Sequence, residues 1–143
     1  MSATLSDRDR ETFGAIADVL IPEAEGMPAA SQIGVQGAAL DHVLSLRPEL
    51  RPALERGLAA CAGAEPTAAA EALNRDDPEA LGAIGLIASA IYYMDPDVRK
   101  RLGYPGQEQR PARDEEEGDY LRDDLLQPVI DRGAIYRRTP DPR

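Results

Sequence analysis

The segment DPEALGAIGLIASAIYYMDP, residues 77–96, contains a long uncharged and mostly apolar run. An acidic residue followed by proline stands at each end of it, at Asp77 and at Asp95, and this pair is typical of a helix N-cap with a first-turn proline. The run between them is too short to span a bilayer comfortably. We therefore predict a buried helix that ends at a sharp corner. One face of this helix should carry Leu81, Ile84, Ile87, Ala88 and Ile91.

Shorter helices are predicted on both sides of this segment. Ser6 can cap a first helix that Pro22 ends, and a long Pro/Gly/Ala-rich connection follows it. A helix through residues 50–61 contains Pro52, so it must begin there or bend. Gly103 should end the helix after the corner. The remaining predicted helices cover residues 35–44, 67–73 and 96–102.

The helix predicted within residues 77–96 contains two glycines, Gly82 and Gly85, which cost about 1 kcal/mol each relative to alanine. We expect these small residues to permit the close approach of another backbone. Alanine, which buries little area, makes up a large share of the 43% hydrophobic residues, so the core should be thin. A domain of this kind gains stability from a partner that binds only its folded state.

The composition changes after Gln107. The following segment is rich in acidic residues, and a short apolar stretch near Leu125 is interrupted by Pro128. No stretch of the sequence shows the alternation typical of a strand. The expected architecture is an all-α, small irregular helical domain (1–107) with long connections, and an extended, acidic, Pro-containing C-terminal arm (108–143) that packs on a partner subunit.

The charge balance excludes one large class of functions. The formal net charge is −10, from 16 Lys and Arg against 26 Asp and Glu, whereas phosphate contacts need clustered basic residues. We therefore expect no nucleic-acid partner. We also expect no direct membrane span, because the longest uncharged run is too short to cross a bilayer. The N-terminal residues lack a basic stretch followed by an apolar one, so we expect no secretory signal or twin-arginine leader. The expected location is cytoplasmic, or periplasmic only if a partner carries the chain there.

Residues that could perform chemistry are few. His42 is the only histidine and Cys61 the only cysteine, so imidazole pairs cannot bind a metal and no intrachain disulfide can form. We expect a buried structural thiol and a non-catalytic histidine, because the neighbouring Asp41 points about 100° away around a helix. The acidic run 114–119 is more typical of a solvated segment than of a Ca²⁺ loop. We expect no catalytic residue, no cofactor and no metal in this chain.

Three of the five tyrosines are gathered between residues 92 and 107, in a chain that is 4% aromatic. Either Tyr92 and Tyr93 close the core at the end of the long helix while Tyr104 packs under the turn, or these rings form an interface. A rigid YPG turn would hold Tyr104 at low entropic cost. We assign these candidate interface residues: Tyr92, Tyr93, Tyr104, Pro105, Gly106, Tyr120 and Tyr136.

Two motifs of the sequence resemble a known family. The first is an ADxLIP pattern at residues 17–22, followed by a Gly/Pro/Ala loop and a GV pair at Gly34 and Val35. The second is YYMDPDVRKRLGYPGQ, residues 92–107, which is similar to a YYxxPxVxxxLGYPGQ pattern. In this order they resemble the gluconate 2-dehydrogenase subunit 3 family, over roughly residues 5–140.

The resemblance implies a non-catalytic small subunit. Its partner would be a flavoprotein of the glucose-methanol-choline type that holds FAD and oxidises a sugar, sugar acid or glycoside. The small subunit would support folding, stability and assembly of that catalytic subunit. Members of exported complexes often carry a twin-arginine leader, so its absence here favours a cytoplasmic complex. The alternatives are a stand-alone helical protein-binding module and, third, a small enzyme that uses His42 with a carboxylate.

Overall fold

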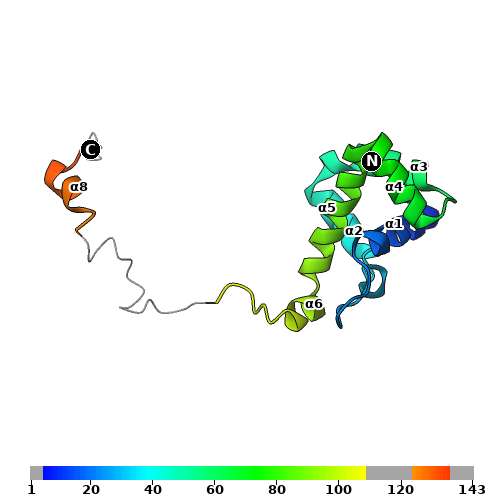
Figure 1. Cartoon of the computed structure of the whole chain (residues 1–143), viewed down its shortest axis with the longest axis horizontal. Coiled ribbons are helices and arrows are strands. Elements are labelled where there is room, and N and C mark those ends of the chain that lie inside the picture. Colours follow the sequence, from blue (N-terminus) through cyan, green and yellow to red (C-terminus); the bar gives the residue numbers. More distant parts are fainter. Residues whose placement is uncertain (1–4, 109–123, 136–143) are drawn as a thin grey trace, which may run out of the picture. The chain divides into compact units, whose positions relative to one another are not determined.

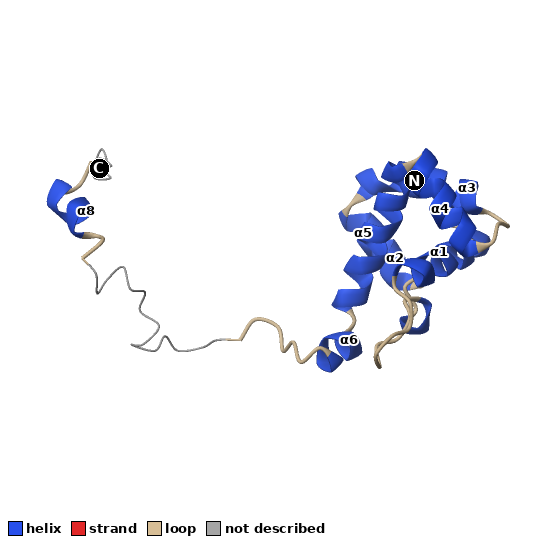
Figure 2. Cartoon of the chain, viewed as in Figure 1, coloured by secondary structure: helices blue, strands red, loops and turns tan. Residues whose placement is uncertain are grey.

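The structure, a computed structural model, describes residues 5–108 and 124–135 (Figure 1). The chain divides into two units, Met1–Gly106 and Gln107–Arg143, and each is described by itself. The described residues form helices and loops without a strand, which confirms the all-α class (Figure 2). The first unit contains α1 (Asp7–Leu20), η1 (Ser31–Ile33), α2 (Ala38–Leu46), η2 (Pro48–Leu50), α3 (Arg51–Cys61), α4 (Pro66–Asp76), α5 (Pro78–Met94) and α6 (Pro96–Arg101). The second contains α8 (Gln127–Arg132).

Helix α5 is the central element of the first unit. It contacts α1, α2, α3, α4 and α6, so most of its circumference faces other helices. The predicted buried face is confirmed at Ile84, Ile87, Ala88 and Ile91, while Leu81 is partly buried against the same core. Burial of such aliphatic side chains contributes about 1.5–3 kcal/mol each. The position of α5 therefore requires apolar residues on this buried face.

An acidic residue followed by proline begins three helices. The carboxylates of Asp77 and Asp95 accept backbone N–H groups at the starts of α5 and α6, as the sequence predicts. Glu65 does the same for α4, at 3.0 Å from Thr67 N and 2.8 Å from Ala68 N. That helix is longer than the 67–73 expected from the apolar pattern, because Pro66 occupies the first turn, where no N–H is needed.

The starts of α1 and α3 also agree with the local sequence. Ser6 caps α1 through a reciprocal box with Asp9, whose carboxylate accepts the Ser6 backbone N–H. Pro52 lies in the first turn of α3, which begins at Arg51 after the short η2. The helix therefore begins at this proline rather than bending around it.

The long connection between α1 and α2 is held by specific hydrogen bonds. The Asp18 carboxylate accepts the Ser31 backbone N–H at 2.7 Å and the Ser31 hydroxyl at 2.6 Å. At its far end, the Arg10 guanidinium donates to Gln36 O at 3.0 Å and pairs with Asp41 at 2.7 Å. Val35 is fully buried below it. The connection is thus irregular in backbone but fixed in place.

The expected backbone approach at Gly82 and Gly85 is wrong. A Cβ added at Gly82 would meet nothing within 4 Å, and one at Gly85 would meet only the side chain of Leu20 at 3.6 Å. Gly82 lies on the exposed side of α5, and helical spacing alone does not reveal which side faces solvent. The close approach occurs instead at Gly57 of α3. A Cβ there would lie 3.1 Å from Ile84 Cδ1 and 3.3 Å from Ala80 Cβ.

A charged contact also joins α3 to the start of α5. Arg56 donates from Nε to the Asp77 carboxylate at 3.1 Å and from Nη2 to the Glu79 carboxylate at 2.9 Å. The hydrogen bond from Arg56, followed by that from the Ala80 backbone N–H, lowers the pKa of Asp77. The ionised form of this cap is therefore favoured by folding.

The two glycines predict opposite effects of one substitution. Gly82→Ala should raise the free energy of unfolding by about 0.5–1 kcal/mol, because alanine loses less backbone entropy and meets no neighbour. Gly57→Ala should lower it, because overpacking of a close contact typically costs about 1–3 kcal/mol. Urea denaturation followed by circular dichroism measures both changes. Stabilisation by Gly57→Ala would contradict this prediction and show that the side chains of Ile84 and Leu73 move to admit the added Cβ.

The cap at Asp77 predicts an acid-dependent part of the stability. Its pKa is lower in the folded chain than in the unfolded one, so the stabilisation is present above the unfolded-state pKa and disappears as the pH falls through the folded-state value. Asp77→Asn keeps a capping side chain that cannot ionise. Urea midpoints measured from pH 6 to pH 3 should therefore fall less steeply in Asp77→Asn and in Arg56→Gln than in the parent. Parallel curves for all three proteins would exclude this contribution.

Candidate functional site

The corner between α5 and α6 is fixed by backbone contacts and by one buried side chain. Val98 of α6 is fully buried, and the Asp95 carboxylate accepts its N–H at 2.9 Å. Gly103 then adopts a φ of 66°, as a terminating glycine does, and Tyr104 N donates to Arg99 O at 2.9 Å. The predicted helix, corner, helical turn and glycine stop are confirmed here.

Tyr92 has a packing role in the structure. Its side chain is 4% exposed, and its hydroxyl donates to Pro28 O at 2.7 Å. Its ring meets that of Tyr93 edge to face, with centroids 5.6 Å apart. Burial raises the pKa of Tyr92. Of the candidate interface residues, this one therefore offers a partner almost no surface of its own.

The connection between α1 and α2 brings the two sequence motifs together. Besides the Tyr92 contact at Pro28, the Arg101 guanidinium donates to Gly26 O at 2.9 Å. Asp18 of the ADxLIP pattern binds the same connection at Ser31. The segments that carry the two patterns are thus linked through one loop, although they are distant in the sequence.

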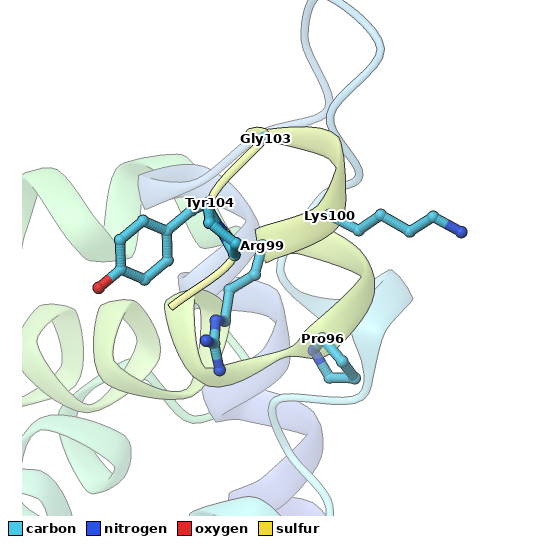
Figure 3. Close-up of a pocket in the computed structure, with 6 residues that line it drawn as sticks. Pro96, Arg99, Lys100, Gly103 and Tyr104 are labelled. Atoms are coloured by element: carbon cyan, nitrogen blue, oxygen red, sulfur yellow. The ribbon is translucent and has the colours of Figure 1, made fainter. Parts of the chain in front are cut away.

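Tyr93 and Tyr104 are the tyrosines that face outward among those the structure describes. Their side chains are 60% and 57% exposed. The Arg99 guanidinium lies over the Tyr104 ring, 5.4 Å from its centroid, in a cation–π contact. Figure 3 shows both side chains beside α6, with Lys100 pointing away from Tyr104. The exposure of Tyr93 and Tyr104 therefore fits the interface alternative, whereas the burial of Tyr92 fits the core-packing alternative.

The YPG turn forms one side of a shallow groove next to α6. The groove has a volume of about 550 Å³ and is lined by Pro96, Arg99, Lys100, Gly103, Tyr104 and Pro105. Gly106 completes the turn with a φ of 94°. This positive φ favours glycine, and a Cβ at this position would lie 2.7 Å from Arg99 Nη2, so any larger residue would also displace the Arg99 guanidinium.

Other exposed apolar side chains at this corner were not identified from the sequence. Met94 and Leu102 are each 52% exposed. Leu86, at 47%, precedes Tyr93 by seven residues, a spacing that places both on one side of α5. We call Tyr93, Met94, Leu102, Tyr104 and Pro105 the corner surface. The sequence shows that Leu86 and Tyr93 share one side of the helix, because they are seven residues apart. Only the fold shows that this side faces solvent.

Helix α8 of the second unit also exposes apolar residues. Pro128 occupies its first turn and does not break it. Within this unit's described residues, five large apolar side chains are exposed: Leu125, Leu126, Val129, Ile130 and Ile135. The candidate residues Tyr120 and Tyr136 and the acidic run 114–119 lie outside the described residues.

The residues considered for chemistry lie apart from one another. His42 is exposed, while its neighbour Asp41 pairs with Arg10. Cys61 is buried, as predicted, and burial raises the pKa of its thiol. Within residues 5–108 and 124–135, no group of three or more His, Cys, Asp or Glu side chains is arranged to hold a metal ion. No helix in the same ranges is long and apolar enough to cross a membrane.

Comparison with known proteins gives no assignment. No protein-family model, no curated protein and no solved structure matches the chain. The resemblance to the gluconate 2-dehydrogenase subunit 3 family therefore stays a prediction. The corner surface and its groove are the candidate site that the geometry supports.

The different environments of the two adjacent tyrosines predict different effects of Tyr→Phe. Tyr92→Phe should lower the free energy of unfolding by about 1 kcal/mol, because it leaves Pro28 O without this hydrogen bond. Tyr93→Phe should change it by less than about 0.5 kcal/mol, as is usual for an exposed position. Thermal and urea denaturation of both variants measure these effects. Equal effects would contradict the assigned roles.

Proposed function

We propose that this chain is a non-catalytic subunit of a flavin-dependent dehydrogenase or oxidase complex. Its partner would be a glucose-methanol-choline type flavoprotein that holds FAD and oxidises a sugar, sugar acid or glycoside. The observation that carries the proposal is the corner surface, because its exposed rings belong to the segment that resembles the family's YYxxPxVxxxLGYPGQ pattern. The chain would support folding, stability and assembly of the catalytic subunit in the cytoplasm.

The chemistry of the corner surface supports a protein partner. Tyrosine supplies a large, fairly rigid area with a polar tip, and it is enriched among the residues that dominate binding energy. Tyr104 is held by Arg99 and by the YPG turn, so less side-chain freedom is lost when a partner covers it. Exposed apolar groups of this kind are more typical of an interface than of a surface in permanent contact with water.

The second unit carries another apolar surface that could contact the flavoprotein. The five exposed apolar residues of the α8 region, from Leu125 to Ile135, have no covering group among the described residues of their unit. An obligate subunit interface commonly exceeds about 2,000 Å², and the corner surface consists of only five residues. We therefore propose that the arm 108–143 packs on the flavoprotein as well.

The alternative function is a stand-alone helical protein-binding module. The observation in its favour is that the first unit has a buried core of its own, including the fully buried Phe13, Leu54 and Ile84. The two functions differ in what they require of the isolated chain. A module would melt cooperatively by itself and bind a peptide, whereas an obligate subunit would gain most of its stability in the complex.

Co-expression tests the accessory-subunit function. The proposal predicts that a glucose-methanol-choline type flavoprotein is encoded beside this chain, and the two are produced together with no other subunit. We expect a yellow complex that co-purifies and a flavoprotein that is less soluble when expressed alone. If the two proteins elute separately and the flavoprotein is fully active and soluble by itself, the proposal is wrong.

The corner surface predicts where that complex is sensitive. Tyr104→Ala and Pro105→Ala should each weaken assembly by at least about 1 kcal/mol, the lower range of an interface hot spot. Leu46→Ala is the matched control, because it removes an exposed apolar side chain, 63% accessible, from another helix. Pull-down with the flavoprotein measures assembly, and circular dichroism confirms unchanged helicity. Unchanged assembly would leave Tyr104 and Pro105 with a local packing role.

A further inference from the structure

The groove beside α6 carries two side-chain cations that have no anionic partner among residues 5–108 and 124–135. Among the described residues, the side chains of Arg99 and Lys100 form no hydrogen bond and no ion pair. The third cation of this helix, Arg101, donates to Gly26 O. Arg99 and Lys100 both line the groove together with Tyr104 and two prolines. The groove thus combines unpaired positive charge with apolar walls.

The Arg99 guanidinium is held in a defined position. One contact is the Tyr104 ring at 5.4 Å, and another is Gly106, where even a Cβ would come within 2.7 Å of Nη2. Arg99 and Lys100 lie in the last turn of α6, where positively charged side chains interact favourably with the helix dipole. The helix dipole explains the positive charge at this position, but it does not explain why the Arg99 guanidinium lies over the Tyr104 ring. A guanidinium fixed in this way loses little freedom when it binds a carboxylate.

The charges around the groove favour an acidic ligand locally. Asp95 caps α6 and accepts two backbone N–H groups, and Asp97 lies in the first turn of that helix. The chain as a whole has a net charge of −10 and repels acidic molecules at long range. At physiological salt, however, charges separated by more than about 8 Å are largely screened. Arg99 and Lys100 are the charged residues that line the groove itself.

We propose that this groove binds an acidic, apolar-containing segment of the partner protein. Carboxylates of that segment pair with Arg99 and Lys100, and its apolar side chains contact Tyr104 and Pro105. The proposal deepens the function given above, since it rests on the flavoprotein for the identity of the segment. Binding of acidic peptides to the groove can be tested without the flavoprotein. A failure of the groove proposal is therefore distinguishable from a failure of the accessory-subunit proposal.

The probe is a hexapeptide with blocked termini and the sequence Glu-Glu-Leu-Leu-Glu-Glu. Its matched control replaces each glutamate by glutamine. Both are titrated into the full 143-residue chain, and the backbone amide spectrum is followed. We expect the acidic peptide alone to shift signals of residues 96–106, with binding that weakens as salt is raised. No shifts, shifts elsewhere, or equal binding of the neutral peptide would overturn the proposal.

Two double variants separate local from global charge. Arg99→Gln with Lys100→Gln should weaken binding of the acidic peptide by at least about tenfold, through loss of two charge-assisted contacts. Arg47→Gln with Arg75→Gln removes the same charge from two exposed arginines elsewhere and should change it by less than about twofold. Circular dichroism confirms that each variant is folded. Equal weakening by the two variants would show a general charge effect and reject the groove.

Two further measurements decide the source of the acidic segment. The chain's own acidic run is neutralised by Asp114→Asn, Glu115→Gln, Glu116→Gln, Glu117→Gln and Asp119→Asn. Affinity for the acidic peptide should stay within about twofold, because screening limits the reach of charges that do not occupy the groove. A gain of tenfold or more would mean that this run occupies the groove, which contradicts a partner segment. In the co-purified complex, Arg99→Glu with Lys100→Glu should promote dissociation at lower salt than in the parent.

Discussion

The burial of α5 is the constraint on which the first unit depends. Helices α1, α2, α3, α4 and α6 all contact it, so a single 17-residue element supplies the common surface of the unit. A charge placed on its inner faces would be desolvated without a partner. Its neighbours approach it closely because they present small residues, of which Gly57 is the clearest case.

A second consequence of this arrangement concerns the connection between α1 and α2. It is bound by Asp18 from α1, by Tyr92 from α5 and by Arg101 from α6. Two of these contacts end on backbone carbonyl groups, which every residue type provides. These contacts constrain the backbone path of the connection more than the identity of its side chains. The helices on either side fix its ends. The corner at α6 gains its position from the same contacts.

The sequence predicts most helix starts because capping is local. An acidic residue, a proline and an apolar pattern lie within one turn of each other at Asp77 and Asp95, so no tertiary information is needed. Glu65 was not recognised, since glutamate is not among the usual N-cap residues. Glycine roles could not be predicted, because Gly57 and Gly82 differ only in which side of their helices meets another element.

The tyrosines show the same limit at the candidate site. Tyr92 and Tyr93 are adjacent and chemically identical, and only the packing of α5 on the loop near Pro28 separates a buried ring from an exposed one. The cluster itself was visible in the sequence, as was the rigid YPG turn. The groove was not, because it depends on the Arg99 side chain folding back over Tyr104.

That contact also fixes the length of the chain at the corner. Arg99 touches the Tyr104 ring and the backbone at Gly106, and Tyr104 N donates to Arg99 O. An inserted or deleted residue between Arg99 and Gly106 would break all three contacts at once. Related sequences should therefore vary in length elsewhere, for example between α3 and α4, while this interval keeps a constant spacing.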